Sequence, residues 1–225
     1  MPSSQYYHIS KIMEMIISLT PNSILDIGSG YGKFGVLCRE YLELWDGRQK
    51  YEFRKRIDCV EVFQDYITPL HKYVYSNIYN KNILELALIL DHKYDLILLI
   101  DVLEHFEKKE GSNLLELLLK NHNGILVSTP KKPSPQKAAF GNIYETHRSK
   151  WTRNDLKKFG ECCFIPDDVS LICYISQNKE LARDFRKNLK NLKRHGKITP
   201  KNRLKKIIRH IPGSLAIYKK IRQSI

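Results

Sequence analysis

The chain has 225 residues, of which 42% are hydrophobic, and it carries 38 Lys and Arg against 24 Asp and Glu. That hydrophobic content is enough to bury a core, which excludes the disordered, collagen-like and disulfide-dense classes. The charge is unevenly placed: positions 179–225 hold 16 Lys and Arg against two acids, which accounts for the whole net charge of +14. We therefore expect a neutral globular domain over residues 1–178 and a basic tail over residues 179–225.

Cysteine usage and hydropathy indicate a cytoplasmic protein. The five cysteines are odd in number and form no C-x-x-C pair, so we expect buried thiols in a reducing compartment and no metal site. The apolar stretch 12–19 contains Glu14 and lacks a cleavage site for a signal peptide. The densest apolar run, residues 96–100, is too short to span a bilayer.

Hydrophobic spacing predicts alternating helices and strands in the first half of the chain. In order, these are a helix over 9–17, a strand over 23–27, a helix over 34–45, a strand over 57–62, a helix from about Asp65 that Pro69 disturbs, and a weaker strand over 76–79.

The second half of the chain continues the alternation of strands and helices and ends in a hairpin. A continuous apolar strand over 94–100, typical of a parallel sheet buried on both faces, precedes a helix around 114–118 and a strand over 125–128. Thr152-x-x-Asp155 has the pattern of a helix start, and the segments 162–165 and 169–175 indicate a closing hairpin. The whole pattern predicts an α/β protein with an open sheet.

A glycine-rich turn follows the first strand, where ligands bind in open α/β sheets. The sequence Gly28-Ser29-Gly30-Tyr31-Gly32 does not have the P-loop spacing, because Phe34 follows Lys33. The spacing Gly30-x-Gly32-x-x-Gly35 would suit a dinucleotide, but the preceding Asp26 would face a pyrophosphate with like charge. A cationic ligand without phosphate, such as S-adenosylmethionine, fits that carboxylate.

A second acid marks the end of the next strand. Glu61 lies 33 residues after Gly28, farther than the usual separation of about 20, and the charged loop 46–56 accounts for the difference. A carboxylate at this position can accept hydrogen bonds from both hydroxyls of a ribose.

Three motifs in order carry a resemblance to a known family. They are Leu25-Asp26-Ile27-Gly28-Ser29-Gly30-Tyr31-Gly32, then Val60-Glu61, then Asp101-Val102-Leu103-Glu104-His105-Phe106. Together they resemble the class I S-adenosylmethionine-dependent methyltransferases, over roughly residues 24–175. The resemblance implies a seven-stranded sheet that is parallel except for one strand of the final hairpin, and a methyl-transferring activity.

The resemblance also implies a set of cofactor-binding residues. Gly28 and Gly30 would pack against the amino-acid portion of the cofactor, with Asp26, Ser29 and Tyr31 beside them. Glu61 would hold the ribose, and Asp101 with Val102 would lie at the methionine end. Many members of the family have an Asp near the adenine amino group, whereas this chain has Asn82 at the matching position. The Asn82 carbonyl can still accept that hydrogen bond.

Two histidines are candidates for the acceptor side of the reaction. His105 follows the fourth strand and His147 follows the fifth, and imidazole can take a proton near neutral pH. Each has an alternative structural interpretation, in which it orients a turn or fixes a loop. The segment 144–152 resembles a stretch in bacterial methyltransferases acting on small molecules, sugars or quinones.

The acceptor is expected to be an oxygen of a small molecule or glycan. The Asn/Asp-Pro-Pro-aromatic motif of amino-methylating nucleic-acid enzymes is absent after the fourth strand, where Asp101-Val102-Leu103-Glu104 stands instead. Two alternatives remain open: an RNA methyltransferase that uses the tail for phosphate contacts, and a cofactor-binding scaffold without activity.

The basic tail has an amphipathic pattern. Over 201–222 apolar residues recur at helical spacing among many Lys and Arg, a pattern typical of helices that bind anionic membrane surfaces. Nucleic acid is a less favoured partner, because few aromatic residues are present for base stacking. A third interpretation is a helical appendage packed on the domain or on another subunit.

Overall fold

The computed structural model describes residues 6–44, 52–138 and 141–196. The chain divides into two compact units, residues 1–188 and 189–225, and every strand among the described residues belongs to the first. The tail positions 201–222 lie outside the described residues.

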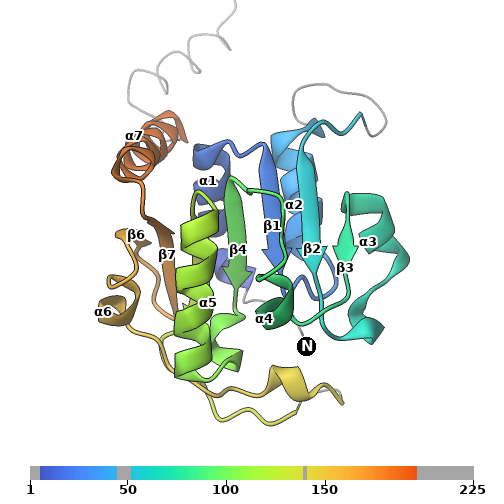
Figure 1. Cartoon of the computed structure of the whole chain (residues 1–225). Helices are drawn as coiled ribbons and strands as arrows, with labels where there is room; N and C mark the ends of the chain where they lie inside the picture. The colour runs from blue at the N-terminus through green and yellow to red at the C-terminus, as the bar shows by residue number, and fades with distance from the viewer. Residues whose placement is uncertain (1–5, 45–51, 139–140, 197–225) are drawn as a thin grey trace, which may run out of the picture. The chain divides into compact units, whose positions relative to one another are not determined.

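A single sheet of seven strands forms the centre of the first unit (Figure 1). Its spatial order is β3-β2-β1-β4-β5-β7-β6, and all neighbouring pairs are parallel except those that β7 makes with β5 and β6. The prediction of a mostly parallel sheet with one reversed strand in the final hairpin is therefore confirmed. The strands are β1 (Ser23–Ile27), β2 (Arg56–Val60), β3 (Ile78–Tyr79), β4 (Leu96–Ile100), β5 (Ile125–Pro130), β6 (Glu161–Ile165) and β7 (Ser170–Ser176).

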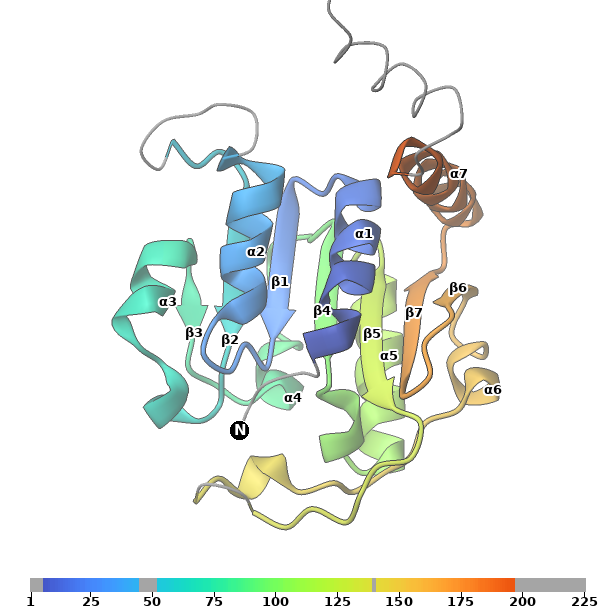
Figure 2. The ribbon, with the colours of Figure 1, turned by 180° about the vertical axis from the view of Figure 1, so that it is seen from behind.

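Helices cover both faces of the sheet. Figure 1 shows α4 and α5 in front of the sheet, and Figure 2, turned by 180°, shows α1 and α2 on the opposite face. Every residue of β1 and β4 is buried between these layers, as the continuous apolar run of β4 predicts. The helices are α1 (Ile9–Leu19), α2 (Lys33–Leu42), α3 (Pro69–Val74), α4 (Ile83–Leu86), α5 (Lys108–Asn121), α6 (Arg153–Leu156) and α7 (Lys179–Gly196).

Capping residues set several helix ends. Thr152 accepts a hydrogen bond from the Asp155 backbone N–H, and the Asp155 side chain accepts one in return, so α6 begins where the sequence predicts. The expected helix from Asp65 is wrong: residues Gln64–Tyr66 form a 3-10 turn, and α3 begins at Pro69 with Thr68 as its cap. Pro69 starts the helix rather than disturbing it, because a first-turn residue needs no backbone donor.

The first turns of α7 belong to the first unit. Ala182 and Phe185 are buried, and the Phe185 ring lies 4.8 Å from that of Tyr174 in β7. Arg186 forms an exposed ion pair with Glu161 in β6. No helix among the described residues has both the length and the apolar character needed to cross a membrane.

Candidate active site

The carboxyl ends of β1, β2 and β4 open into a cavity of about 620 Å³. Parallel strands bring their carboxyl ends to one edge, so loops that are far apart in the sequence meet there. All but one of the residues that the sequence assigned to cofactor or catalysis line this cavity, namely Asp26, Gly28, Ser29, Gly30, Glu61, Asn82, Asp101, Val102, His105 and His147. The exception is Tyr31, which is exposed and packs its ring against Tyr66.

The glycine turn needs glycine for two separate reasons. Gly28, Gly30 and Gly32 all have positive φ, at 69°, 54° and 84°. A Cβ on Gly28 would also lie 2.5 Å from Cγ2 of Val102, across the mouth of the cavity. The turn therefore brings backbone rather than side chain to the edge of the cavity, which suits close approach of a ligand.

Asp26 is a buried carboxyl group directly behind this turn. It is 3% exposed, and the Tyr75 hydroxyl donates to its Oδ2 at 2.6 Å. Burial raises the pKa of Asp26 to about 6, and the hydrogen bond from Tyr75 opposes part of that rise. The protein thus keeps an acid where its ionised form is poorly solvated, an arrangement typical of functional sites.

Glu61 is tied to the same turn. The Gly30 backbone N–H donates to its Oε2 at 2.8 Å, and the Phe63 N–H donates to its Oε1 at 3.0 Å. Burial raises the pKa of Glu61 to about 7; these two bonds lower it in part, while the charges of Glu145 and Asp26 raise it further. Each oxygen retains a lone pair that a hydroxyl could use.

Asn82 also has a structural role as a helix cap. Its Oδ1 accepts the Leu84 backbone N–H at 3.0 Å, which caps the short helix α4. The side chain still lines the cavity. The sequence did not predict α4, because four residues are too few for helical spacing to show.

Asp101 lies at the end of β4 in an unusual backbone conformation, with φ of 55°. Ser128 in β5 donates to its Oδ1 at 2.8 Å, and His8 Nε2 lies 3.6 Å from its Oδ2. His8 is fully buried, and neither of its ring nitrogens has a hydrogen-bond partner among the described residues. Sequence reasoning missed His8, since nothing in the local pattern links it to a residue 93 positions away.

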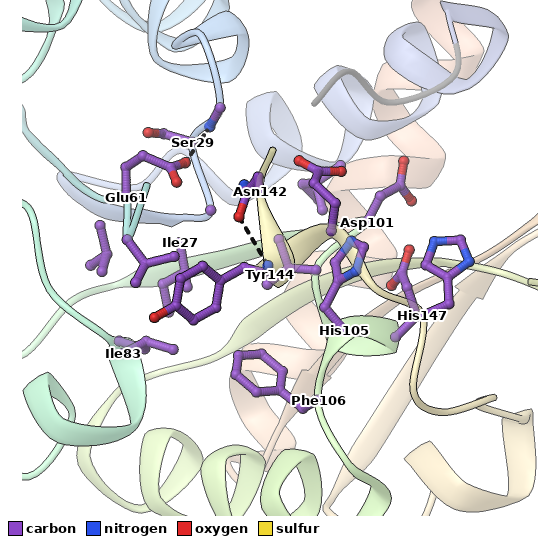
Figure 3. A pocket seen from close by; sticks show the side chains of 18 of the residues that line it. Ile27, Ser29, Glu61, Ile83, Asp101, His105, Phe106, Asn142, Tyr144 and His147 are labelled. Carbon is purple, nitrogen blue, oxygen red and sulfur yellow. Dashed lines mark hydrogen bonds between the residues drawn. The ribbon is translucent and has the colours of Figure 1, made fainter. Parts of the chain in front are cut away.

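His105 and His147 lie side by side at one end of the pocket, near Asp101, while Ser29 and Glu61 lie at the other end (Figure 3). Their ring centroids are 5.1 Å apart. His105 Nδ1 bonds to the Thr146 carbonyl at 3.2 Å, and His147 Nδ1 bonds to the Ser134 carbonyl at 2.7 Å. Burial lowers the pKa of His105; the bond to Thr146 opposes this effect, and the neighbouring His147 reinforces it.

Trp151 holds the loop that brings the two histidines together. Its indole Nε1 donates to the Leu103 carbonyl at 3.2 Å and to Ser149 Oγ at 2.9 Å. The backbone N–H groups of Arg148 and Ser149 both donate to the Glu104 carbonyl. The segment after β5 is thereby fixed to the turn after β4.

Glu104 completes this end of the cavity. It is 1% exposed, and its Oε2 has no hydrogen-bond partner among the described residues. Burial raises the pKa of Glu104 to about 8, and the nearby charge of Asp101 adds to the rise. The sequence places Glu104 in a motif but indicates no role for it, because its burial depends on the loop after β5 that covers it.

No model of a protein family and no curated protein matches the sequence. Solved structures do match the fold. The N-terminal domain of EvdMO1 with S-adenosylhomocysteine bound superposes with a TM-score of 0.56 at 12% identity, covering 78% of this chain and 83% of that one. An O-methyltransferase family protein from Burkholderia thailandensis gives 0.53 at 11% identity, covering 76% of this chain and 57% of that one.

An rRNA methylase from Escherichia coli matches with a TM-score of 0.50 at 18% identity, covering 76% of this chain and 64% of that one. The chain therefore spans little more than half the length of the Burkholderia protein and less than two thirds of the Escherichia coli protein. At these identities the likeness concerns the fold. The chain has the Rossmann-like α/β fold that these proteins share, with the seven-stranded sheet that the family resemblance implies.

Proposed function

We propose that the chain is an S-adenosylmethionine-dependent methyltransferase that acts on a hydroxyl oxygen of a small-molecule or glycan acceptor. The observation that carries this proposal is the acidic lining of the glycine-turn cavity, where Asp26, Glu61 and Asp101 all face one space. An anionic dinucleotide would be repelled there, whereas a cationic nucleoside is attracted. Bound S-adenosylhomocysteine in the EvdMO1 structure supports the same ligand class.

The residues present fit such a ligand from end to end. The turn at Gly28 and Gly30 offers a close backbone surface, and Glu61 offers lone pairs for two ribose hydroxyls. Asn82 also lines the cavity, and its amide could meet an adenine ring. Asp101 and Val102 would face the methionine portion, between the glycine turn and the histidines.

S-adenosylmethionine supplies a methyl group already activated on a sulfonium, so the protein's task is to position the acceptor and manage its proton. An acceptor hydroxyl near His105 and His147 would form a new oxygen–carbon bond as the carbon–sulfur bond breaks, leaving a neutral thioether. Each imidazole donates its Nδ1 proton to a backbone carbonyl, so its Nε2 lone pair is left on the acceptor side. These are the groups we expect to act on the hydroxyl proton.

Calorimetry with S-adenosylmethionine, S-adenosylhomocysteine and NADH tests the cofactor directly. We expect both sulfur compounds to bind with one site per chain and NADH not to bind. Binding of NADH in preference to S-adenosylmethionine, or no binding of either sulfur compound, would contradict the proposal. A matched pair of variants, Glu61→Gln in the cavity and Glu116→Gln on the exposed side of α5, should separate a lost ribose contact from a general effect.

The acceptor class needs a screen with radiolabelled methyl donor over metabolite, glycan-precursor and RNA pools. Label in the first two pools supports the proposal. The second candidate, an RNA methyltransferase, is favoured by the positive charge of residues 179–225 and would place the label in RNA. Tight S-adenosylhomocysteine binding without label in any pool would favour a scaffold instead.

A further inference from the structure

Three potential metal ligands meet at the acceptor end of the cavity. Glu104, His105 and His147 each offer one ligand atom, and these atoms all lie within 4.8 Å of one another. Ligand atoms around a tetrahedral zinc ion, with bonds of about 2.1 Å, lie roughly 3.4 Å apart, so side-chain adjustments of about 1 Å suffice to close the set. Two residues come from the turn after β4 and the third from the loop after β5, so the fold, not the local sequence, assembles the group.

Glu104 provides an independent observation that points to a ligand. Its side chain is almost fully buried, yet Oε2 lacks a hydrogen-bond partner within the described residues. An unpaired buried carboxyl oxygen costs stability, and native proteins seldom keep one without a reason. A cation at this position would satisfy it.

The two histidines are oriented as metal ligands usually are. A backbone carbonyl can only accept a hydrogen bond, so the bonds to Thr146 and Ser134 place a proton on Nδ1 of each ring. In the neutral imidazole this leaves the lone pair on Nε2. Metal-bound histidines typically donate their other N–H to a carbonyl or carboxylate, which fixes the tautomer and the ring orientation.

We propose that Glu104, His105 and His147 bind a divalent transition-metal ion at the acceptor end of the cavity. Two imidazoles and one carboxylate suit zinc, iron or manganese, and such sets leave coordination positions open. The three residues line the same cavity as the glycine turn. If the proposed methyltransferase function holds, the two histidines would act on the hydroxyl proton through the ion, because their Nε2 lone pairs would be bound to it. The ion would bind an acceptor oxygen and lower the pKa of that hydroxyl, which narrows the acceptor to hydroxyl- or carboxylate-bearing molecules.

Metal binding can be tested without any catalytic assay. Full-length protein freed of metal by a chelator is titrated with Co²⁺, whose visible absorption reports protein ligands, and with Zn²⁺ in equilibrium dialysis. We expect one ion per chain. The variants Glu104→Gln, His105→Gln and His147→Gln should each weaken Zn²⁺ affinity by at least about tenfold. The controls Glu116→Gln and His92→Gln, which lie outside the cavity, should leave it unchanged.

Circular dichroism and thermal unfolding in the absence of metal check that the variants fold. No Co²⁺ absorption in the wild-type chain, or an affinity that survives all three ligand substitutions, would overturn the proposal. Calorimetry with S-adenosylhomocysteine on the same samples distinguishes a failure of the metal-site proposal from a failure of the methyltransferase proposal. Cofactor binding without metal binding refutes only the metal site, whereas metal binding without cofactor binding refutes only the methyltransferase.

Discussion

Three buried carboxyl groups, Asp26, Glu61 and Glu104, share one cavity, and burial raises the pKa of each. A carboxyl group whose pKa is raised in the folded state stabilises the fold only while it is protonated, at low pH. That stability is lost as the pH rises through the folded pKa. At neutral pH these groups therefore work against folding, and their presence makes sense if a ligand offsets the cost. A cationic nucleoside at Asp26 and a metal ion at Glu104 would each do so.

Substitution of Asp26 tests whether a ligand offsets this cost, because it should change both the stability of the protein and its affinity for the ligand. Its pKa rises from 3.8 to about 6, so ionising it in the folded protein at pH 8 costs about 3 kcal/mol by linkage. We expect Asp26→Asn to increase the free energy of unfolding at pH 8 and to have little benefit at pH 4. The same change should weaken S-adenosylmethionine binding and flatten its rise in affinity between pH 5 and 7.

Urea unfolding at the two pH values and calorimetry across the pH range measure these effects. Asp58→Asn is the matched control, because Asp58 is buried in the neighbouring strand β2 but bonded to Arg56, Tyr94 and Asn77. It should lower stability and leave the pH dependence of binding unchanged. If Asp26→Asn is destabilising at pH 8, or binds S-adenosylmethionine as the wild type does, the assignment of Asp26 is wrong.

At the scale of elements, the sequence predicts the features that a local pattern of residues determines. The apolar run of β4 and the Gly28 turn carry their own signals, in hydrophobicity and in backbone freedom. The contact of His8 with Asp101 has no local signal, because it depends on where α1 packs. Likewise, His105 and His147 are separate candidates in the sequence, and they become neighbours because Trp151 and the Glu104 carbonyl hold the loop after β5 to the turn after β4.

A buried ion pair at the opposite end of the sheet is a second feature that no local pattern reveals. Arg39 in α2 pairs with Glu43 and also donates to the carbonyls of Val74 and Lys55. It thereby connects α2 to the end of α3 and the approach to β2. Because both side chains are at most 4% exposed, loss of one partner leaves the other charge buried without its opposite charge.

Arg39→Met should therefore lower the free energy of unfolding by about 3–5 kcal/mol. Adding Glu43→Gln should recover part of that loss, since the remaining charge disappears while Oε1 can still accept from the Lys55 backbone N–H. The exposed pair of Arg186 and Glu161 provides the comparison, and Arg186→Ala should cost at most about 1 kcal/mol. Urea unfolding curves of the wild type and of these three variants measure the free energies of unfolding. A double variant that is no more stable than Arg39→Met would contradict this account.

At the scale of the whole molecule, charge and chemistry occupy different parts of the chain. Seven acidic residues and four Lys or Arg line the cavity, whereas positions 197–225 contain nine Lys and Arg and no Asp or Glu. The basic segment begins beyond the buried contacts of Ala182 and Phe185, so a chain ending at Gly196 keeps those contacts intact. Truncation can therefore test the proposed catalytic cavity and the proposed membrane-binding segment separately.

We expect the full chain to be retained on vesicles containing anionic lipid at low salt and to be released at high salt. Each Lys or Arg near such a surface contributes about 1 kcal/mol, and that attraction is screened within a Debye length. A chain of residues 1–196 should lose retention while binding S-adenosylhomocysteine as tightly as the full chain does. The full-length variant Lys205→Glu/Lys206→Glu should show intermediate retention. Co-sedimentation measures retention, and a parallel titration with RNA covers the rival partner. Equal retention of both chains, or tail-dependent binding to RNA but not to lipid, would refute the membrane interpretation.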